Sequence, residues 1–228
     1  MTIALGIDFG NYIFMAADTR ISYYLLGRKI SFHDDSTKIY KTKIGLITGA
    51  GYSDLLDSVK KRLAEIEVDN TNKILDIIKD ERSKYEKEID NKSLESTRWI
   101  LSYTTIVNNN IKFRVALYDP SGGHYLGIVK EENKPLIIFP SEASEKEVKK
   151  LAPVLEDKIK PFNEFNDLSE SIQYHFEIIG IFIKAIQPKY PSMSVLFQFG
   201  IHSHAGCGIS PIINLKEQKT ISIKLNFS

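Results

Sequence analysis

The first twenty residues constrain the fold of this chain more than any other stretch. They read MTIALGIDFGNYIFMAADTR, in which apolar residues at positions 3, 5 and 7 alternate with small or polar ones. This period of two is typical of a β-strand with one buried face. Turn-forming residues follow, and Gly10 or Asn11 can adopt a positive φ there. Because a second apolar run, Tyr12 to Ala17, comes next, we predict that the chain begins with a β-hairpin.

Thr2 is the first hydroxyl-bearing residue of this hairpin. If Met1 is removed, Thr2 carries both a hydroxyl and a free α-amine. The pKa of an α-amine is about 7.7–8.0, so the amine can accept the hydroxyl proton near neutral pH, and threonine paired with its own terminal amine is an established nucleophile. The alternative is that Thr2 is only a β-branched residue of a first strand. The segments that follow favour the nucleophile.

Composition places the chain among ordinary soluble proteins. A length of 228 residues predicts one domain or at most two, and 43% apolar with 26% charged residues is a usual balance. The formal net charge of +1 gives no reason to expect a nucleic-acid or anionic-membrane partner. A single cysteine, Cys207, excludes an intramolecular disulfide and suits a reducing compartment.

Targeting and membrane segments are not expected. The N-terminus has no basic segment followed by a continuous apolar core. The longest strongly apolar run, Phe176 to Ile186, contains Glu177 and Lys184 and is too short to cross a bilayer. We therefore expect a cytoplasmic protein without a membrane partner.

Four segments in the first third of the chain follow a known order. They are Thr2, then Ala17-Asp18-Thr19-Arg20, then Lys38-Ile39-Tyr40-Lys41, then the glycine-containing stretch Ile47 to Asp54. This order resembles the β-type subunits of the proteasome and their bacterial relatives, in the N-terminal nucleophile (Ntn) hydrolase superfamily. The spacing from Thr2 to Asp18 agrees with the family, and the segment from Asp18 to Lys38 is a few residues longer. The resemblance thins out after the first third.

Patterns in the rest of the chain predict an alternation of strands and helices. Four strands precede two helices, three or four strands follow, and two helices and two strands close the chain. Besides the hairpin, we expect strands at 37–40, 44–48, 99–107, 111–118, 124–129, 193–201 and 221–227. Helices are expected at 55–66, with a cap at Ser53, at 74–85, with a cap at Asn70 or Thr71, and at 168–186. A further helix begins with a capping box at Ser144 and Glu147, and Pro153 should kink or interrupt it.

This order allows two sheets with helices on both outer faces. The resemblance implies the same α+β fold, the four-layer αββα sandwich of Ntn hydrolases, as a single domain over residues 1–228. The pattern alone would also fit other α+β folds.

The resemblance implies a role for each matching residue. Lys38 would approach the Thr2 amine and hydroxyl, and Asp18 would hold Lys38. An ammonium close to the α-amine lowers the pKa of that amine and leaves it free to accept a proton. Gly49 would present its backbone N–H to the developing oxyanion, with Gly51 as the alternative.

Further residues of the family pattern are matched in part. Ile21 and Ser22 would line the substrate channel. Ser192 matches the serine of an Asp-x-x-Ser pattern, with Lys189 in the place of the aspartate. The stretch 139–144 contains serines but lacks the glycines of the family's Gly-Ser-Gly loop.

The leading hypothesis is a threonine peptidase that cleaves peptides or unfolded proteins, without cofactor or metal, and assembles as a homo-oligomeric ring or dimer. Assembly is expected because the helix at 176–186 is apolar nearly all round. A connectase-like transpeptidase or ligase that uses the same Thr2 is one alternative, and a catalytically silent assembly subunit is another. His202, His204 and Cys207 could in principle bind zinc, but their spacing matches no recognised zinc pattern.

Overall fold

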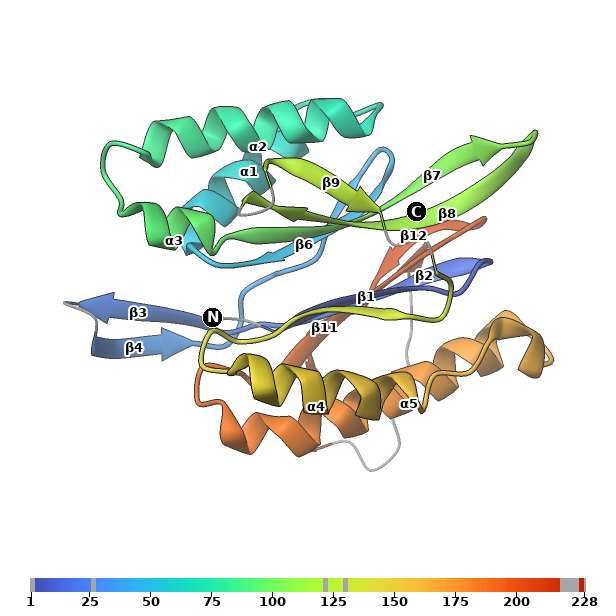
Figure 1. The fold of residues 1–228 in the computed structure, drawn as a ribbon. Coiled ribbons are helices and arrows are strands. Elements are labelled where there is room, and N and C mark those ends of the chain that lie inside the picture. Colours follow the sequence, from blue (N-terminus) through green and yellow to red (C-terminus); the bar gives the residue numbers. More distant parts are fainter. Residues whose placement is uncertain (1–2, 26–27, 121–122, 129–130, 218–225, 228) are drawn as a thin grey trace.

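The computed structural model describes residues 3–25, 28–120, 123–128, 131–217 and 226–227. These residues form a mixed α+β arrangement in which the paired strands are antiparallel (Figure 1). One sheet has the strand order β10-β1-β2-β11-β12-β14, with β13 paired to β11. Its strands are β1 (Ala4–Asp8), β2 (Tyr12–Asp18), β10 (Pro135–Ile138), β11 (Leu196–Ser203), β12 (Gly206–Ile209), β13 (Ile213–Asn214) and β14 (Asn226–Phe227).

The second sheet has the order β5-β6-β7-β8-β9. It consists of β5 (Tyr40–Thr42), β6 (Gly45–Ala50), β7 (Arg98–Val107), β8 (Asn110–Asp119) and β9 (Tyr125–Ile128). Two further strands, β3 (Ile21–Leu25) and β4 (Arg28–His33), pair with each other as a separate ribbon.

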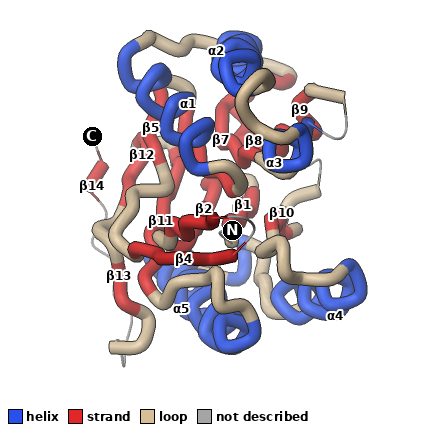
Figure 2. Tube along the Cα trace, turned by 90° about the vertical axis from the view of Figure 1, so that its left-hand side faces the viewer, coloured by secondary structure: helices blue, strands red, loops and turns tan. Residues whose placement is uncertain are grey.

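Helices lie on both outer sides of the two sheets. Figures 1 and 2 show α1, α2 and α3 beside the sheet that contains β6 to β8, and α4 and α5 beside the sheet that contains β1, β2 and β11. Their bounds are α1 (Ser53–Glu65), α2 (Thr71–Tyr85), α3 (Asn91–Glu95), α4 (Glu145–Glu156) and α5 (Leu168–Ile186), with short 3₁₀ turns at Phe162–Glu164 and Gln187–Lys189. In the described ranges, no helix is long and apolar enough to span a membrane.

The opening hairpin forms as predicted, and Gly10 adopts the positive φ, at 80°. The expected half-exposure is wrong, because β1 and β2 are buried along their whole length. Large side chains such as Leu5 and Ile7 pack toward α5. In β1, the small residues face the other sheet, and a Cβ added at Gly6 would lie 2.9 Å from Ile100. The alternation of large and small residues therefore marks two buried faces rather than one.

The helix signals are largely confirmed. The Asn70 side chain accepts a hydrogen bond from the Lys73 N–H at 3.0 Å, and the capping box at the start of α4 is present. Ser53 is the first residue of α1 rather than its cap, and the capping position is Tyr52. Pro153 does not end α4, which continues to Glu156.

The predicted elements differ from the structure in several further places. Residues 37–39 lie outside a strand, and β5 begins at Tyr40. The ribbon of β3 and β4 was not predicted, because its sequence mixes aromatic, polar and charged residues without a clear period. Of the predicted strand at 221–227, only Asn226–Phe227 belongs to the described residues.

Helix α5 is covered mainly by its own chain. Its large apolar residues, including Phe176, Ile179 and Ile183, belong to a core cluster with β1, β2 and β11. Ile181 is 62% exposed. The apolar character of this helix is therefore explained mostly by packing within one chain, and it gives only weak support for assembly.

Candidate active site

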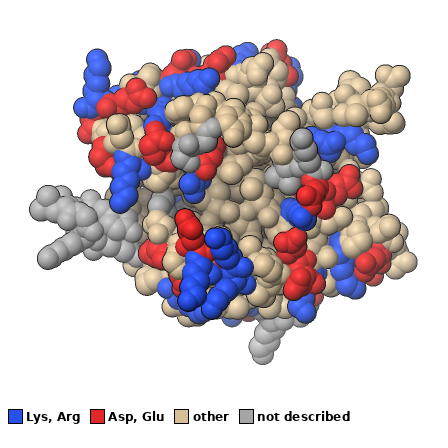
Figure 3. All heavy atoms as spheres, in the orientation of Figure 1, with Lys and Arg blue, Asp and Glu red and all other residues tan. Residues whose placement is uncertain are grey.

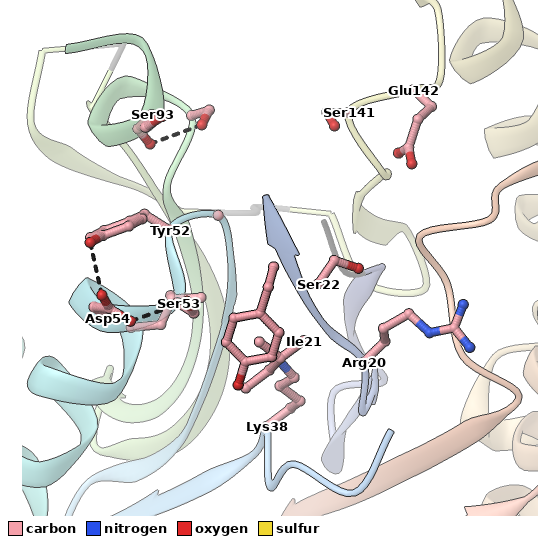
Figure 4. Close-up of a pocket in the computed structure, with 14 residues that line it drawn as sticks. Arg20, Ile21, Ser22, Lys38, Tyr52, Ser53, Asp54, Ser93, Ser141 and Glu142 are labelled. Carbon is pink, nitrogen blue, oxygen red and sulfur yellow. Dashed lines mark hydrogen bonds between the residues drawn. The ribbon is translucent and has the colours of Figure 1, made fainter. Parts of the chain in front are cut away.

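A cleft of about 690 Å³ opens beside the end of the hairpin. Its lining comes from β3, the start of α1, helix α3 with its C-cap residue Ser96, and the loop before α4. Figure 4 shows Lys38 at its base, with Tyr52 and Asp54 on one side and Glu142 on the other. Segments that are far apart in the sequence therefore converge on Lys38.

Lys38 is positioned by a glutamine from β11. Gln198 accepts two hydrogen bonds through Oε1, from the backbone N–H of Lys38 at 3.0 Å and of Ile39 at 2.9 Å. Gln198 is buried opposite Ala17 in the sheet. One side chain thus fixes the irregular segment before β5 against the end of β2.

The ammonium of Lys38 lies in an unfavourable environment for a charge. The side chain is only 4% exposed. Burial first, and then repulsion from Lys60, lower the pKa of Lys38 to about 8, although attraction to Asp18 and Asp57 acts in the opposite direction. Lys38 is therefore mostly protonated at pH 7 and loses its proton just above physiological pH.

Asp18 ends β2 and is fully buried. Its Oδ2 accepts a hydrogen bond from the Ser194 N–H at 2.8 Å, and its own N–H donates to the Ile3 carbonyl at 3.2 Å. The first described residue of the chain thus lies against Asp18. Thr2 itself lies outside the described residues.

Arg20 closes the site on the side of the ribbon. Its Nε and Nη2 bind the two carboxylate oxygens of Asp34 at 2.6 and 2.7 Å, and its Nη1 donates to the Pro191 carbonyl at 2.7 Å. The guanidinium also stacks 4.0 Å from the Phe32 ring centroid. A bidentate pair of this kind fixes geometry as well as charge, so Arg20 ties the base of β3–β4 to the loop before β11.

Ile21 and Ser22, the expected channel residues, both line the cleft. They belong to β3, and in Figure 4 this strand stands above Lys38. The Ser22 Oγ is buried and accepts or donates no hydrogen bond among the described residues.

The two candidate oxyanion glycines lie in different places. Gly49 is buried within β6 opposite Trp99, where an added Cβ would lie 2.8 Å from the Arg98 carbonyl. Gly51 lines the cleft two residues before α1, with φ at 138°, and an added Cβ would lie 2.4 Å from the Thr97 Cα. Only Gly51 of the two is a lining residue.

Ser192 lies behind the cleft wall rather than in it. It is 2% exposed, and its Oγ donates to Glu142 Oε2 at 2.8 Å. Glu142 lines the cleft. A carboxylate from the loop before α4 thus partners the serine that sequence reasoning singled out.

The histidine and cysteine cluster has a packing role. The His202 Nδ1 lies 3.1 Å from the Ser102 hydroxyl, and burial lowers the pKa of His202 to about 4. Burial also raises the pKa of the Cys207 thiol to about 11. Across the described part of the chain, no group of three His, Cys, Asp or Glu residues is arranged to hold a metal ion.

Comparison with known proteins shows the fold. No protein-family model matches the sequence significantly, and neither does any curated protein. Among solved structures, an Anbu (Gly-1) mutant from Hyphomicrobium sp. strain MC1 matches with a TM-score of 0.64 and 11% identity, over 96% of this chain and 89% of that chain. The fold is distantly proteasome-like. At this identity, the likeness to Anbu concerns the fold alone.

Three residues of the site were not found from the sequence. Gln198, Lys60 and Glu142 reach Lys38 or Ser192 from positions far away in the chain. The sequence signal for Lys60 is a lysine on the apolar stripe of a helix, since α1 places it on the same face as the buried residues Leu56 and Leu63. Gln198 interrupts an apolar strand, which is a comparable signal.

Proposed function

We propose that the protein is a proteasome-like threonine peptidase, in which removal of Met1 exposes Thr2 as the nucleophile. The observation that carries this proposal is Lys38, which is buried at the base of the cleft and is attracted electrostatically to Asp18. The Asp18 N–H donates to the carbonyl of Ile3, the residue that follows Thr2 in the sequence. A lysine this deeply buried is destabilising as a cation. Its position beside a cleft favours a chemical role.

The proposed reaction is acyl transfer. The Thr2 hydroxyl attacks the peptide carbonyl carbon, and its proton passes to the Thr2 α-amine. The positive charge of Lys38 lowers the pKa of that amine, so it is neutral and ready to accept the proton. When the intermediate collapses, the proton moves to the leaving amide nitrogen, and an ester on Thr2 remains. Water then hydrolyses the ester and restores the hydroxyl.

The supporting groups follow from the cleft. Gly51 replaces Gly49 as our oxyanion donor, because Gly51 lines the cleft and an N–H at that place could meet the developing charge. Ser192 and Glu142 act as a hydrogen-bonded pair. Glu142 supplies the carboxylate that the family pattern has at the position of Lys189. Ile21 and Ser22 contact the substrate chain.

The finer assignment of fold and assembly belongs to this proposal. We assign residues 1–228 to a single cytoplasmic domain of the four-layer αββα type, which forms a homo-oligomer with further copies of the chain. Figure 3 shows acidic and basic side chains interspersed on one face, with an uncharged projection at the tip where β7 ends and β8 begins. Ile106 is 74% and Ile111 55% exposed on this projection. Exposed apolar residues of this kind favour subunit contacts.

Intact mass and active-site labelling test the proposal. Protein from its native host should lack Met1, and a β-lactone or epoxyketone probe should label Thr2. Lys38→Ala should abolish labelling with the fold retained by circular dichroism, whereas Lys79→Ala, at an exposed lysine of α2, should not change it. Retention of Met1, or labelling unaffected by Lys38→Ala, would refute the proposal.

The same assay separates the two alternatives. A protein that lacks Met1 and never labels Thr2 is a silent assembly subunit. A protein that labels Thr2 and transfers the acyl group to an added peptide amine faster than to water is a transpeptidase.

A further inference from the structure

A second buried lysine lies beside Lys38 and has no place in the mechanism above. Lys60 is on α1 and is only 5% exposed. Its Nζ donates to the Thr37 carbonyl at 3.3 Å and to Asp57 Oδ1 at 3.3 Å. The same nitrogen lies 4.9 Å from the ring centroid of Tyr40.

These contacts bracket Lys38. Thr37 immediately precedes Lys38, and Tyr40 follows it by two residues. Lys60 therefore holds the segment from α1, while Gln198 holds its backbone from the opposite side. We propose that Lys60 is a positioning residue for Lys38, which fixes the segment 37–40 against α1 and places a second positive charge next to the base of the cleft.

The two lysines differ in how well their charges are compensated. Lys60 has a carboxylate, a carbonyl and an aromatic ring as partners. For Lys38, the effect of burial outweighs the attraction to Asp18 and Asp57. The charged groups that act on Lys38 are Asp18 from β2, and Lys60 and Asp57 from α1. Burial lowers the pKa of Lys60 as well, but Asp57 opposes that shift by attraction and by its hydrogen bond. The charge of Lys60 in turn lowers the pKa of Lys38.

The consequence for the site is a charge that depends on pH close to neutrality. With Lys60 in place, the pKa of Lys38 is lowered to about 8. Without the charge of Lys60, the pKa of Lys38 should rise toward its ordinary value. The catalytic meaning of this inference rests on the proposed function, but the effect on Lys38 itself does not.

The test is competitive labelling of Lys38 with acetic anhydride over pH 6–10, read by peptide mass spectrometry. Lys60→Met should slow labelling of Lys38 near pH 7.5 by about threefold or more, which corresponds to a rise in its pKa of at least about half a unit. Lys60→Arg keeps the charge and should label like the wild type. Lys61→Met removes the adjacent exposed lysine of α1 and should have no effect.

A second variant tests the same inference if Lys60→Met does not fold. Asp57 is 46% exposed on its side chain, so Asp57→Asn should fold. It should speed labelling of Lys38, because the variant loses the direct attraction of Asp57 for Lys38 and leaves the charge of Lys60 less compensated. Unchanged labelling in Lys60→Met or in Asp57→Asn, or equal slowing in Lys60→Met and Lys60→Arg, would overturn the inference. If a β-lactone never labels Thr2 while these shifts in Lys38 occur, the proposed function fails and the role of Lys60 stands.

Discussion

Replacement of Lys38 by methionine should make the protein more stable at neutral pH. The pKa of Lys38 is lowered from 10.5 to about 8, and each unit of pKa corresponds to roughly 1.4 kcal/mol. At pH 7, the folded protein therefore holds a buried ammonium that costs about 3 kcal/mol relative to the unfolded chain. Lys38→Met keeps an unbranched side chain that is one atom shorter than lysine, and it removes the cost of the buried charge.

The sign of the pH dependence follows from linkage. Because the pKa of Lys38 is lower in the folded state, the unfolded chain binds more protons between about pH 8 and 10.5, and the stability of the wild type rises with pH in that window. Lys38→Met lacks this dependence. The difference in free energy of unfolding between Lys38→Met and the wild type should therefore decrease by about 2–3 kcal/mol between pH 7 and pH 10.

Urea unfolding followed by circular dichroism measures both quantities. Lys79→Met, at an exposed lysine of α2, is the matched control and should stay within about 0.5 kcal/mol of the wild type at both pH values. The comparison across pH removes differences in packing between lysine and methionine, since these do not titrate. A stability gap that is constant or widens from pH 7 to pH 10 would show that Lys38 is not a destabilising buried cation.

Three further changes test other parts of the structure. Gly51→Ala should lower stability by more than about 2 kcal/mol in urea unfolding, because the positive φ is strained and the new Cβ would meet the Thr97 backbone at 2.4 Å; a neutral effect would contradict this geometry. Gln198→Leu should cost about 2–4 kcal/mol, since two buried N–H groups including that of Lys38 lose their acceptor; Gln198→Glu, which keeps an acceptor, should lose less. Ile106→Lys should lower the assembled fraction in light scattering across a concentration series, and unchanged assembly would exclude the β7–β8 tip as a contact.

Apolar periodicity in the sequence predicted those strands and helices whose pattern extends over several consecutive residues. The hairpin and α5 have apolar periods long enough to identify them, and both are present. The two glycines at 49 and 51 could not be separated from the sequence, because both follow an apolar run. Their difference comes from sheet pairing, which buries Gly49 opposite Trp99 and leaves Gly51 beyond the end of β6.

The partners of the site residues required the three-dimensional arrangement. Gln198 meets Lys38 only because β11 pairs with β2, and Glu142 meets Ser192 across 50 positions of sequence. No period or spacing encodes such contacts. The buried lysine and glutamine could only be noticed as polar residues in apolar surroundings, without an indication of what they bind.

The separate ribbon of β3 and β4 has a consequence for how this protein can diverge. In the described residues, its strands pair only with each other, and the Arg20–Asp34 ion pair clamps its base. Ile21 and Ser22 therefore present one wall of the cleft from a part of the chain that carries little of the core. Mutations there can change what the cleft accepts at a small cost in folding, while Asp18 and Lys38 stay anchored by the sheets. In the proposed peptidase, selection can thus act on substrate recognition and on catalysis separately.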